Sequence, residues 1–140
     1  MEHNQKAHAQ SMVNKKVYDI RGKCPEATQD VHENTKNRNW TIENFGYGPM
    51  NPDAPNEEFW EKKADIFNTT VEEAETARCG NCSAFDQTCS IIDCMAKGIN
   101  EEGSASDPYQ VIQYGNLGYC QLFKFKCAGA RTCDAWVHGG

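Results

Sequence analysis

The sequence has no long apolar run and few apolar residues overall. Of its 140 residues 39% are hydrophobic, and the mean hydropathy is −0.75. No run of about 18 apolar residues exists, so no membrane-spanning segment is expected. No continuous apolar segment follows Met1 either, so no secretory signal is predicted, and the expected location is the cytoplasm or an assembled particle. Since so polar a chain cannot fill a large core, we expect a metal, disulfides or a partner to order part of it.

Positive charge is also scarce. Fourteen Lys and Arg residues face 20 Asp and Glu residues, which leaves a net charge of −6. Nucleic-acid binding needs a basic stripe, and none is visible, so a nucleic-acid partner is not expected. The sequence also contains no glycine-rich phosphate loop, no Ser/His/Asp arrangement and no paired catalytic carboxylates, so enzymatic activity is not predicted.

Residues 1–54 are dominated by Asn, Gln, His and Lys, and their apolar residues follow no clear period. Turn signals at Gly46, Gly48-Pro49 and Asn51-Pro52 close the segment. We therefore predict an extended N-terminal arm over residues 1–54. It would wrap around its own domain or dock on a neighbouring protein subunit.

Residues 55–140 contain clearer helix signals. A helix is predicted over residues 56–67, and Thr70 with Glu73 matches a capping box that opens a second, short helix. Residues 88–97 suit a third helix that Gly98 would end, and Tyr109 to Tyr114 fit either a strand or a helix. With a hairpin expected around Lys124 to Arg131, the predicted fold is a small, loop-rich, mainly α domain with short β hairpins, organised by a metal cluster.

Cysteine is the residue that this sequence has in excess. Seven of the eight cysteines lie between residues 79 and 133, and the Cys79-Gly80-Asn81-Cys82 motif can hold one metal centre on a tight turn. A CxxC motif alone fits zinc, an iron–sulfur cluster or a redox dithiol. A zinc ribbon needs a second CxxC pair, which is missing. A thioredoxin-type site needs a strand before the motif, where a helix is predicted. Dispersed single cysteines are easier to place around a larger iron–sulfur cluster.

Three motifs together resemble the ligand set of high-potential iron–sulfur proteins. They are Cys79-x2-Cys82, Gly118-Tyr119-Cys120-Gln121-Leu122-Phe123, and Cys133-x2-Trp136. The resemblance covers roughly residues 75–138. It implies that Cys79, Cys82, Cys120 and Cys133 ligate a [4Fe–4S] cluster and that Phe85, Phe123 and Trp136 shield it from water. A tyrosine that packs on the cluster in this family lies upstream of the first cysteine, and Tyr18 and Tyr47 are both candidates.

The remaining cysteines are Cys24, Cys89, Cys94 and Cys127. Each could be a small buried apolar residue, and Cys89 or Cys94 could pair with Cys24 or Cys127 in a disulfide. A framework made only of disulfides is the main alternative to a metal centre.

Two functions follow from the sequence. The first is one-electron transfer by a [4Fe–4S] protein of high-potential type, whose redox partner the sequence does not identify. The second is a structural role in a multi-subunit assembly, such as a virion, where a cluster or metal holds the fold together and the arm docks on a neighbour. The absence of an export signal, the long arm with its scattered aromatic residues and the polar composition favour the second function.

Overall fold

The computed structural model describes residues 24–102 and 107–138. In chain order its elements are α2 (Glu26–Gln29), α3 (Val31–Phe45), α4 (Glu57–Phe67), α5 (Val71–Ala74), the 3-10 turn η1 (Cys79–Asn81), β1 (Phe85–Asp86), α6 (Cys89–Glu102), α7 (Pro108–Gly115), β2 (Leu117–Cys120) and β3 (Phe125–Ala128). The three strands form one antiparallel sheet in the order β1-β2-β3. The predicted fold class, a small mainly α domain with a short β hairpin, is confirmed.

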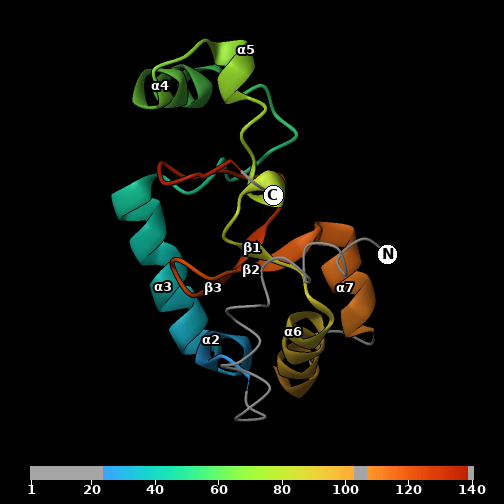
Figure 1. Cartoon of the computed structure of the whole chain (residues 1–140). Helices are drawn as coiled ribbons and strands as arrows, with labels where there is room; N and C mark the ends of the chain where they lie inside the picture. The colour runs from blue at the N-terminus through green and yellow to red at the C-terminus, as the bar shows by residue number, and fades with distance from the viewer. Residues whose placement is uncertain (1–23, 103–106, 139–140) are drawn as a thin grey trace.

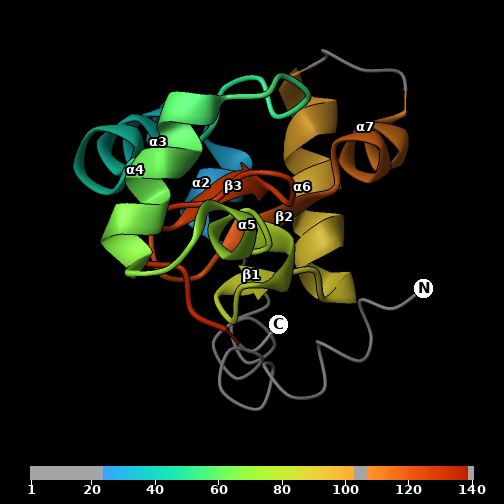
Figure 2. The same cartoon turned by 90° about the horizontal axis from the view of Figure 1, so that it is seen from above.

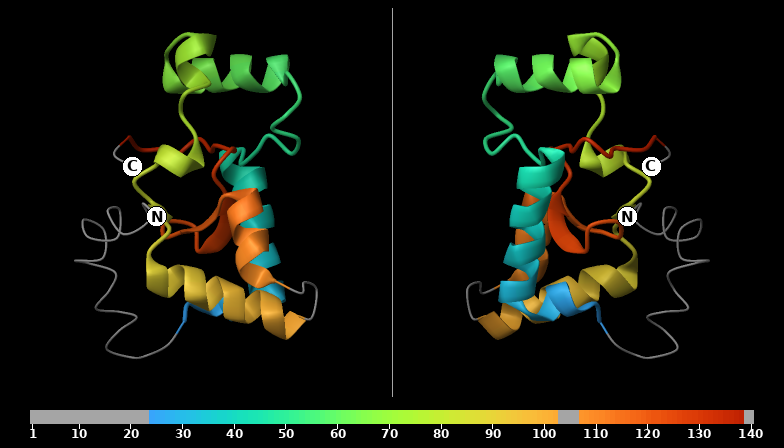
Figure 3. Two further views of the ribbon diagram at one scale, coloured as in Figure 1. Left: turned by 90° about the vertical axis from the view of Figure 1, so that its right-hand side faces the viewer. Right: turned by 90° about the vertical axis from the view of Figure 1, so that its left-hand side faces the viewer.

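The sheet and η1 lie between two groups of helices (Figure 1). Helices α4 and α5 pack together at one end of the molecule, and α6 lies across α2 at the other end (Figure 3). Seen from above, α3 and α6 flank the sheet on opposite sides (Figure 2).

Three small groups of buried side chains replace a single large core. The first joins α2, α6, α7 and β2 through Ala27, Ile91, Met95, Ala96, Ile99, Ile112 and Tyr119. The second joins α4 and α5 through Trp60, Ala64 and Ala74. Between them lies a third group that is built largely of cysteine and aromatic side chains. The scarcity of apolar residues is thus reflected in a core that is divided into separate parts.

The helix predictions are confirmed for residues 56–67, where α4 forms, and for Thr70, whose side chain accepts a hydrogen bond from the Glu73 amide at 3.1 Å. Residues 108–115 form the helix α7, which decides between the two structures expected for Tyr109 to Tyr114. The hairpin predicted around Lys124 to Arg131 lies earlier in the chain. Its two strands are β2 (Leu117–Cys120) and β3 (Phe125–Ala128), so the turn precedes β3.

The prediction of an extended arm is wrong for the part of residues 1–54 that the structure describes. Residues 26–29 and 31–45 are helical, and Tyr47 is 4% exposed within the cysteine-containing core. Most apolar side chains of α3 are not buried, so its sequence shows little helical periodicity. Tyr18 lies outside the described residues.

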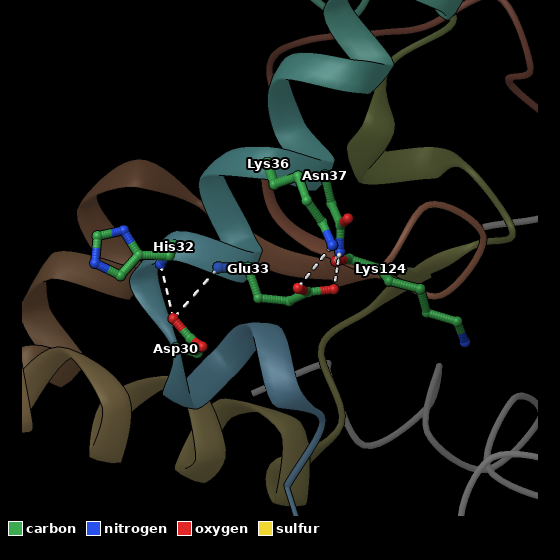
Figure 4. Close-up of polar contacts among 6 residues, drawn as sticks. All are labelled: Asp30, His32, Glu33, Lys36, Asn37 and Lys124. Atoms are coloured by element: carbon green, nitrogen blue, oxygen red, sulfur yellow. Dashed lines mark hydrogen bonds and ion pairs between the residues drawn. The ribbon is translucent and has the colours of Figure 1, made fainter.

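Polar side chains attach α3 to the sheet. The amide of Asn37 donates to the carbonyl of Lys124 at 2.7 Å, and the oxygen of Asn34 accepts from the backbone N–H of Lys126 at 2.7 Å. Asp30 caps the helix by accepting from the amides of His32 and Glu33 (Figure 4). Asparagine therefore satisfies one backbone group of the edge strand β3 and one of the turn before it, and this orders a helix that apolar burial alone would not hold.

Gly98 lies inside α6 and does not end it, contrary to the sequence prediction, since the helix continues to Glu102. A Cβ atom at this position would lie 1.7 Å from the carbonyl oxygen of Thr28. Gly98 is therefore a point of close approach between α6 and the backbone of α2.

Replacing Gly98 with alanine should destabilise the protein, because the new methyl group meets backbone that cannot move without separating α2 from α6. We expect the free energy of unfolding to fall by about 2–3 kcal/mol. Urea unfolding followed by circular dichroism measures this change. Lys97→Ala, at an exposed neighbouring position of the same helix, is the matched control and should leave stability nearly unchanged. Equal stabilities of the two variants would contradict the close approach.

Candidate metal centre

Five cysteines from separate parts of the chain gather in the central core. Cys79, Cys82 and Cys127 are buried there, and Cys120 and Cys133 are partly buried and pack against the same group. We call Cys79, Cys82, Cys120, Cys127 and Cys133 the cysteine cluster. None of the five forms a disulfide. All four cysteines expected to be ligands are thus brought into one group. Cys127 joins them and is a buried free thiol, one of the two states that the sequence left open for it.

Backbone hydrogen bonds place the Cys79–Cys82 turn against the segment that follows β3. The Gly80 amide donates to the Gly129 carbonyl at 3.0 Å, and the Cys79 amide donates to the Arg131 carbonyl. A Cβ atom on Gly80 would lie 3.3 Å from the same Gly129 oxygen, so glycine permits this close contact.

The C-terminal segment closes over the same turn. The indole N–H of Trp136 donates to the Arg78 carbonyl and to the Asn81 side chain, both at 2.9 Å. The Ser83 amide donates to the Val137 carbonyl at 2.9 Å. Cys133 is thereby held close to Cys79 and Cys82, although more than fifty residues separate them in sequence.

A largely buried ion pair also fixes the position of the C-terminal segment that contains Cys133. Asp134, which follows Cys133, forms an ion pair with Lys63 of α4, a side chain that is only 3% exposed. The Asp134 amide donates to the Phe45 carbonyl at 2.7 Å. Helices α3 and α4 therefore both fix the position of the Cys133 loop.

Backbone amides point at the sulfur atoms. The Phe123 amide donates to Cys120 Sγ at 3.3 Å, and the Val137 amide donates to Cys82 Sγ at 3.4 Å. The backbone of Ala135 also favours negative charge on Cys133, because it lowers the pKa of that thiol against the larger effect of burial. Such donors stabilise negative charge on sulfur and therefore suit thiolates better than neutral thiols.

Burial opposes ionisation of these thiols in the absence of a cation. It is the main cause that raises the pKa of Cys120 to about 11 and that of Cys133 to about 12, and neighbouring cysteines contribute to both increases. Burial also raises the pKa of Cys127 well above its usual range. A bound metal reverses this preference, because a coordinated thiol gives up its proton.

Aromatic side chains surround the cysteine cluster. Phe85 and Phe125 are each 1% exposed, and Phe123 and Trp136 pack against the group. The three residues predicted to shield a cluster, Phe85, Phe123 and Trp136, thus lie in this group or against it. Tyr47, one of the two candidates for the tyrosine that packs on a cluster, also lies in this group. Its hydroxyl oxygen accepts a hydrogen bond from the Ala128 amide at 2.9 Å. Its ring meets that of Phe125 edge-on, with the ring centroids 4.9 Å apart.

Two contributors could not be assigned to the site from sequence. Phe125 has no motif of its own, and only the alternation of buried residues along β3 would have indicated it. Cys127 lies two residues further on the same face of that strand. Cys89 is exposed at the start of α6, and Cys24 forms a disulfide with Cys94, one of the pairings that the sequence left open.

Within residues 24–102 and 107–138, no three Cys, His, Asp or Glu side chains are arranged to bind a single metal ion. A mononuclear zinc site needs four ligands within about 2.3 Å of one ion. A [4Fe–4S] cluster instead takes four thiolates, one on each iron, and so holds its ligand sulfurs further apart. The donor set consists of thiols alone, with backbone amides that donate to the sulfurs of Cys120 and Cys82, and thiolates are the ligands that such a cluster takes.

Comparison with protein-family models, with curated proteins and with solved structures finds no match to this chain. In the part of the chain that the structure describes, no helix is long and apolar enough to cross a membrane.

Proposed function

We propose that this protein binds a [4Fe–4S] cluster through Cys79, Cys82, Cys120 and Cys133 and uses it for one-electron transfer of the high-potential type. One observation carries the proposal: cysteines from three distant segments meet in one buried group with aromatic side chains around it. The sequence resemblance to high-potential iron–sulfur proteins names the same four cysteines. When bound, the cluster would supply a one-electron couple without bond chemistry on a substrate.

The residues of the chain would tune and protect that couple. The amides of Phe123 and Val137 donate to the sulfurs of Cys120 and Cys82, and these donors would favour the more negative, reduced form. The buried rings of Phe85 and Phe125 exclude water and act in the opposite direction, since an apolar wall disfavours added negative charge. The potential reflects the balance between these two effects.

A structural role is a second candidate, and the divided core favours it. The cysteine cluster connects η1, the sheet and the C-terminal segment between two small apolar groups. A cluster bound there would add folding free energy directly. The docking of residues 1–54 on a neighbouring subunit stays a prediction; residues 31–45 pack on β3 of the same chain.

Iron and acid-labile sulfide analysis of anaerobically purified protein tests the proposal. We expect about four irons and four sulfides per chain. A protein without iron and sulfide would overturn the proposal, and zinc binding or disulfide formation would then be the functions left for these cysteines. A redox titration followed by visible absorbance then separates the two roles. A carrier shows a reversible one-electron couple, whereas a structural cluster leaves the fold indifferent to redox state and its removal unfolds the chain.

A further inference from the structure

Two partly buried arginines lie beside the Cys79–Cys82 turn without a carboxylate partner. Arg78 precedes the turn, and the backbone carbonyl of Arg131 accepts the amide of Cys79. Neither arginine forms an ion pair with a described residue. This is unexpected in a chain where 20 acidic residues face 14 Lys and Arg residues. Two positive charges are therefore left without a compensating charge next to the cysteine cluster.

The guanidinium group of Arg78 is fixed in position by neutral partners. It donates to the backbone carbonyls of Glu75 and Ala130, at 2.7 and 2.8 Å. Its central carbon lies 4.6 Å from the centre of the Trp60 ring. Carbonyl groups and rings orient a guanidinium group but carry no net charge, so the positive charge of Arg78 is held in place and not neutralised.

Arg131 lies closer to the wall of the cysteine cluster. Its guanidinium carbon is 5.4 Å from the centre of the Tyr47 ring, and Tyr47 belongs to the same buried group as Cys79. One of its terminal nitrogens donates to the Met50 carbonyl at 3.1 Å. Its Nε–H is buried and has no acceptor among the described residues. A half-buried cation with an unsatisfied donor is costly alone, and a nearby anion would offset that cost.

We propose that Arg78 and Arg131 supply the countercharge of the bound cluster and raise its reduction potential. This inference rests on the proposed function, since it needs a cluster at the four cysteines. Four thiolate ligands give such a centre a net negative charge, and reduction adds one more negative charge. Fixed positive charge nearby therefore stabilises the reduced form more than the oxidised form.

Arg78→Gln and Arg131→Gln test the proposal, because each removes a charge and keeps a polar side chain. In the iron-loaded proteins we expect the equilibrium constant for one-electron reduction to fall about three- to tenfold, a decrease in midpoint potential of about 30 to 59 mV. Arg131→Lys keeps the charge and should stay nearer the wild-type potential. Lys97→Gln makes the same charge change at an exposed position of α6 and should leave the potential unchanged.

Iron retention provides a second measurement. Both glutamine variants should release iron to a chelator faster than the wild-type protein, and Lys97→Gln should not, because only the two arginines would hold the anionic centre electrostatically. If Arg131→Gln does not fold, Arg131→Met keeps the unbranched stem without the charge and is measured in its place.

Three results would overturn the assignment. One is a wild-type potential in both glutamine variants. Another is a decrease in Arg131→Lys as large as that in Arg131→Gln, which would attribute the effect to the shape of the side chain and not to its charge. The last is an equal decrease in Lys97→Gln, which would make net charge, and not position, the cause. Failure of the proposed function is separate, because the wild-type protein would then contain no iron or sulfide.

Discussion

Replacing Cys120 or Cys133 with alanine is expected to reduce bound iron and sulfide to less than about a tenth of the wild-type amount. Each residue would supply the only protein ligand to one iron, and alanine offers no atom that can replace it. Both side chains are partly buried members of the cysteine cluster, so the access of water to the missing position is restricted. Iron and sulfide analysis after anaerobic reconstitution measures the loss.

The control for this prediction is Cys89→Ala, which should bind the full amount of iron because Cys89 is exposed on α6, outside the cluster. The circular dichroism spectrum of each ligand variant should match that of wild-type protein from which the metal has been stripped. This comparison separates loss of a ligand from unrelated misfolding. Full iron binding by Cys120→Ala would show that the four-ligand assignment is wrong.

The sequence predicted the members of the site better than their surroundings. Cys79-x2-Cys82 and the motifs around Cys120 and Cys133 are local patterns, and they identified four cysteines that the fold brings together. Cys127 and Phe125 could not be placed by such patterns, because only the pairing of β2 with β3 turns them toward the same group. Sequence spacing indicates possible ligands, whereas the residues around them depend on strand register.

The N-terminal segment shows a different limit. Its sequence is polar because α3 is anchored by asparagine side chains that bond to backbone groups of the sheet, at Lys124 and Lys126. Hydrophobic periodicity cannot detect such an interaction, since neither partner is apolar. The prediction that Gly98 ends a helix was wrong for a related reason. A glycine can mark either the end of a helix or a point of close packing, and the sequence alone does not tell the two apart.

Two oxidation states of cysteine occur side by side in this fold. Cys24 and Cys94 form a disulfide, while the five thiols of the cysteine cluster remain reduced. Disulfides persist in oxidising surroundings, where closely spaced thiols would also become oxidised. Ligation to iron would protect such thiols, because it occupies the sulfur atoms and excludes oxidants.

Removing the Cys24–Cys94 disulfide is expected to lower the free energy of unfolding by about 4 kcal/mol, through the double variant Cys24→Ser/Cys94→Ser. The bond spans 70 residues, so its loss returns considerable entropy to the unfolded chain. It also holds α2 against α6, where the side chain of Gln29 donates to the Cys94 carbonyl at 2.8 Å. Urea unfolding of the iron-loaded protein, followed by circular dichroism, measures the difference.

The same double variant should keep its iron, because the disulfide joins α2 to α6 and neither cysteine belongs to the cysteine cluster. Cys89→Ser, on the same helix as Cys94, is the matched control and should unfold at nearly the wild-type urea concentration. Stability equal to wild type in the double variant would show that the 24–94 link contributes nothing to the fold. Loss of iron together with stability would instead mean that the α2–α6 end and the cysteine cluster unfold as one cooperative unit, which the divided core argues against.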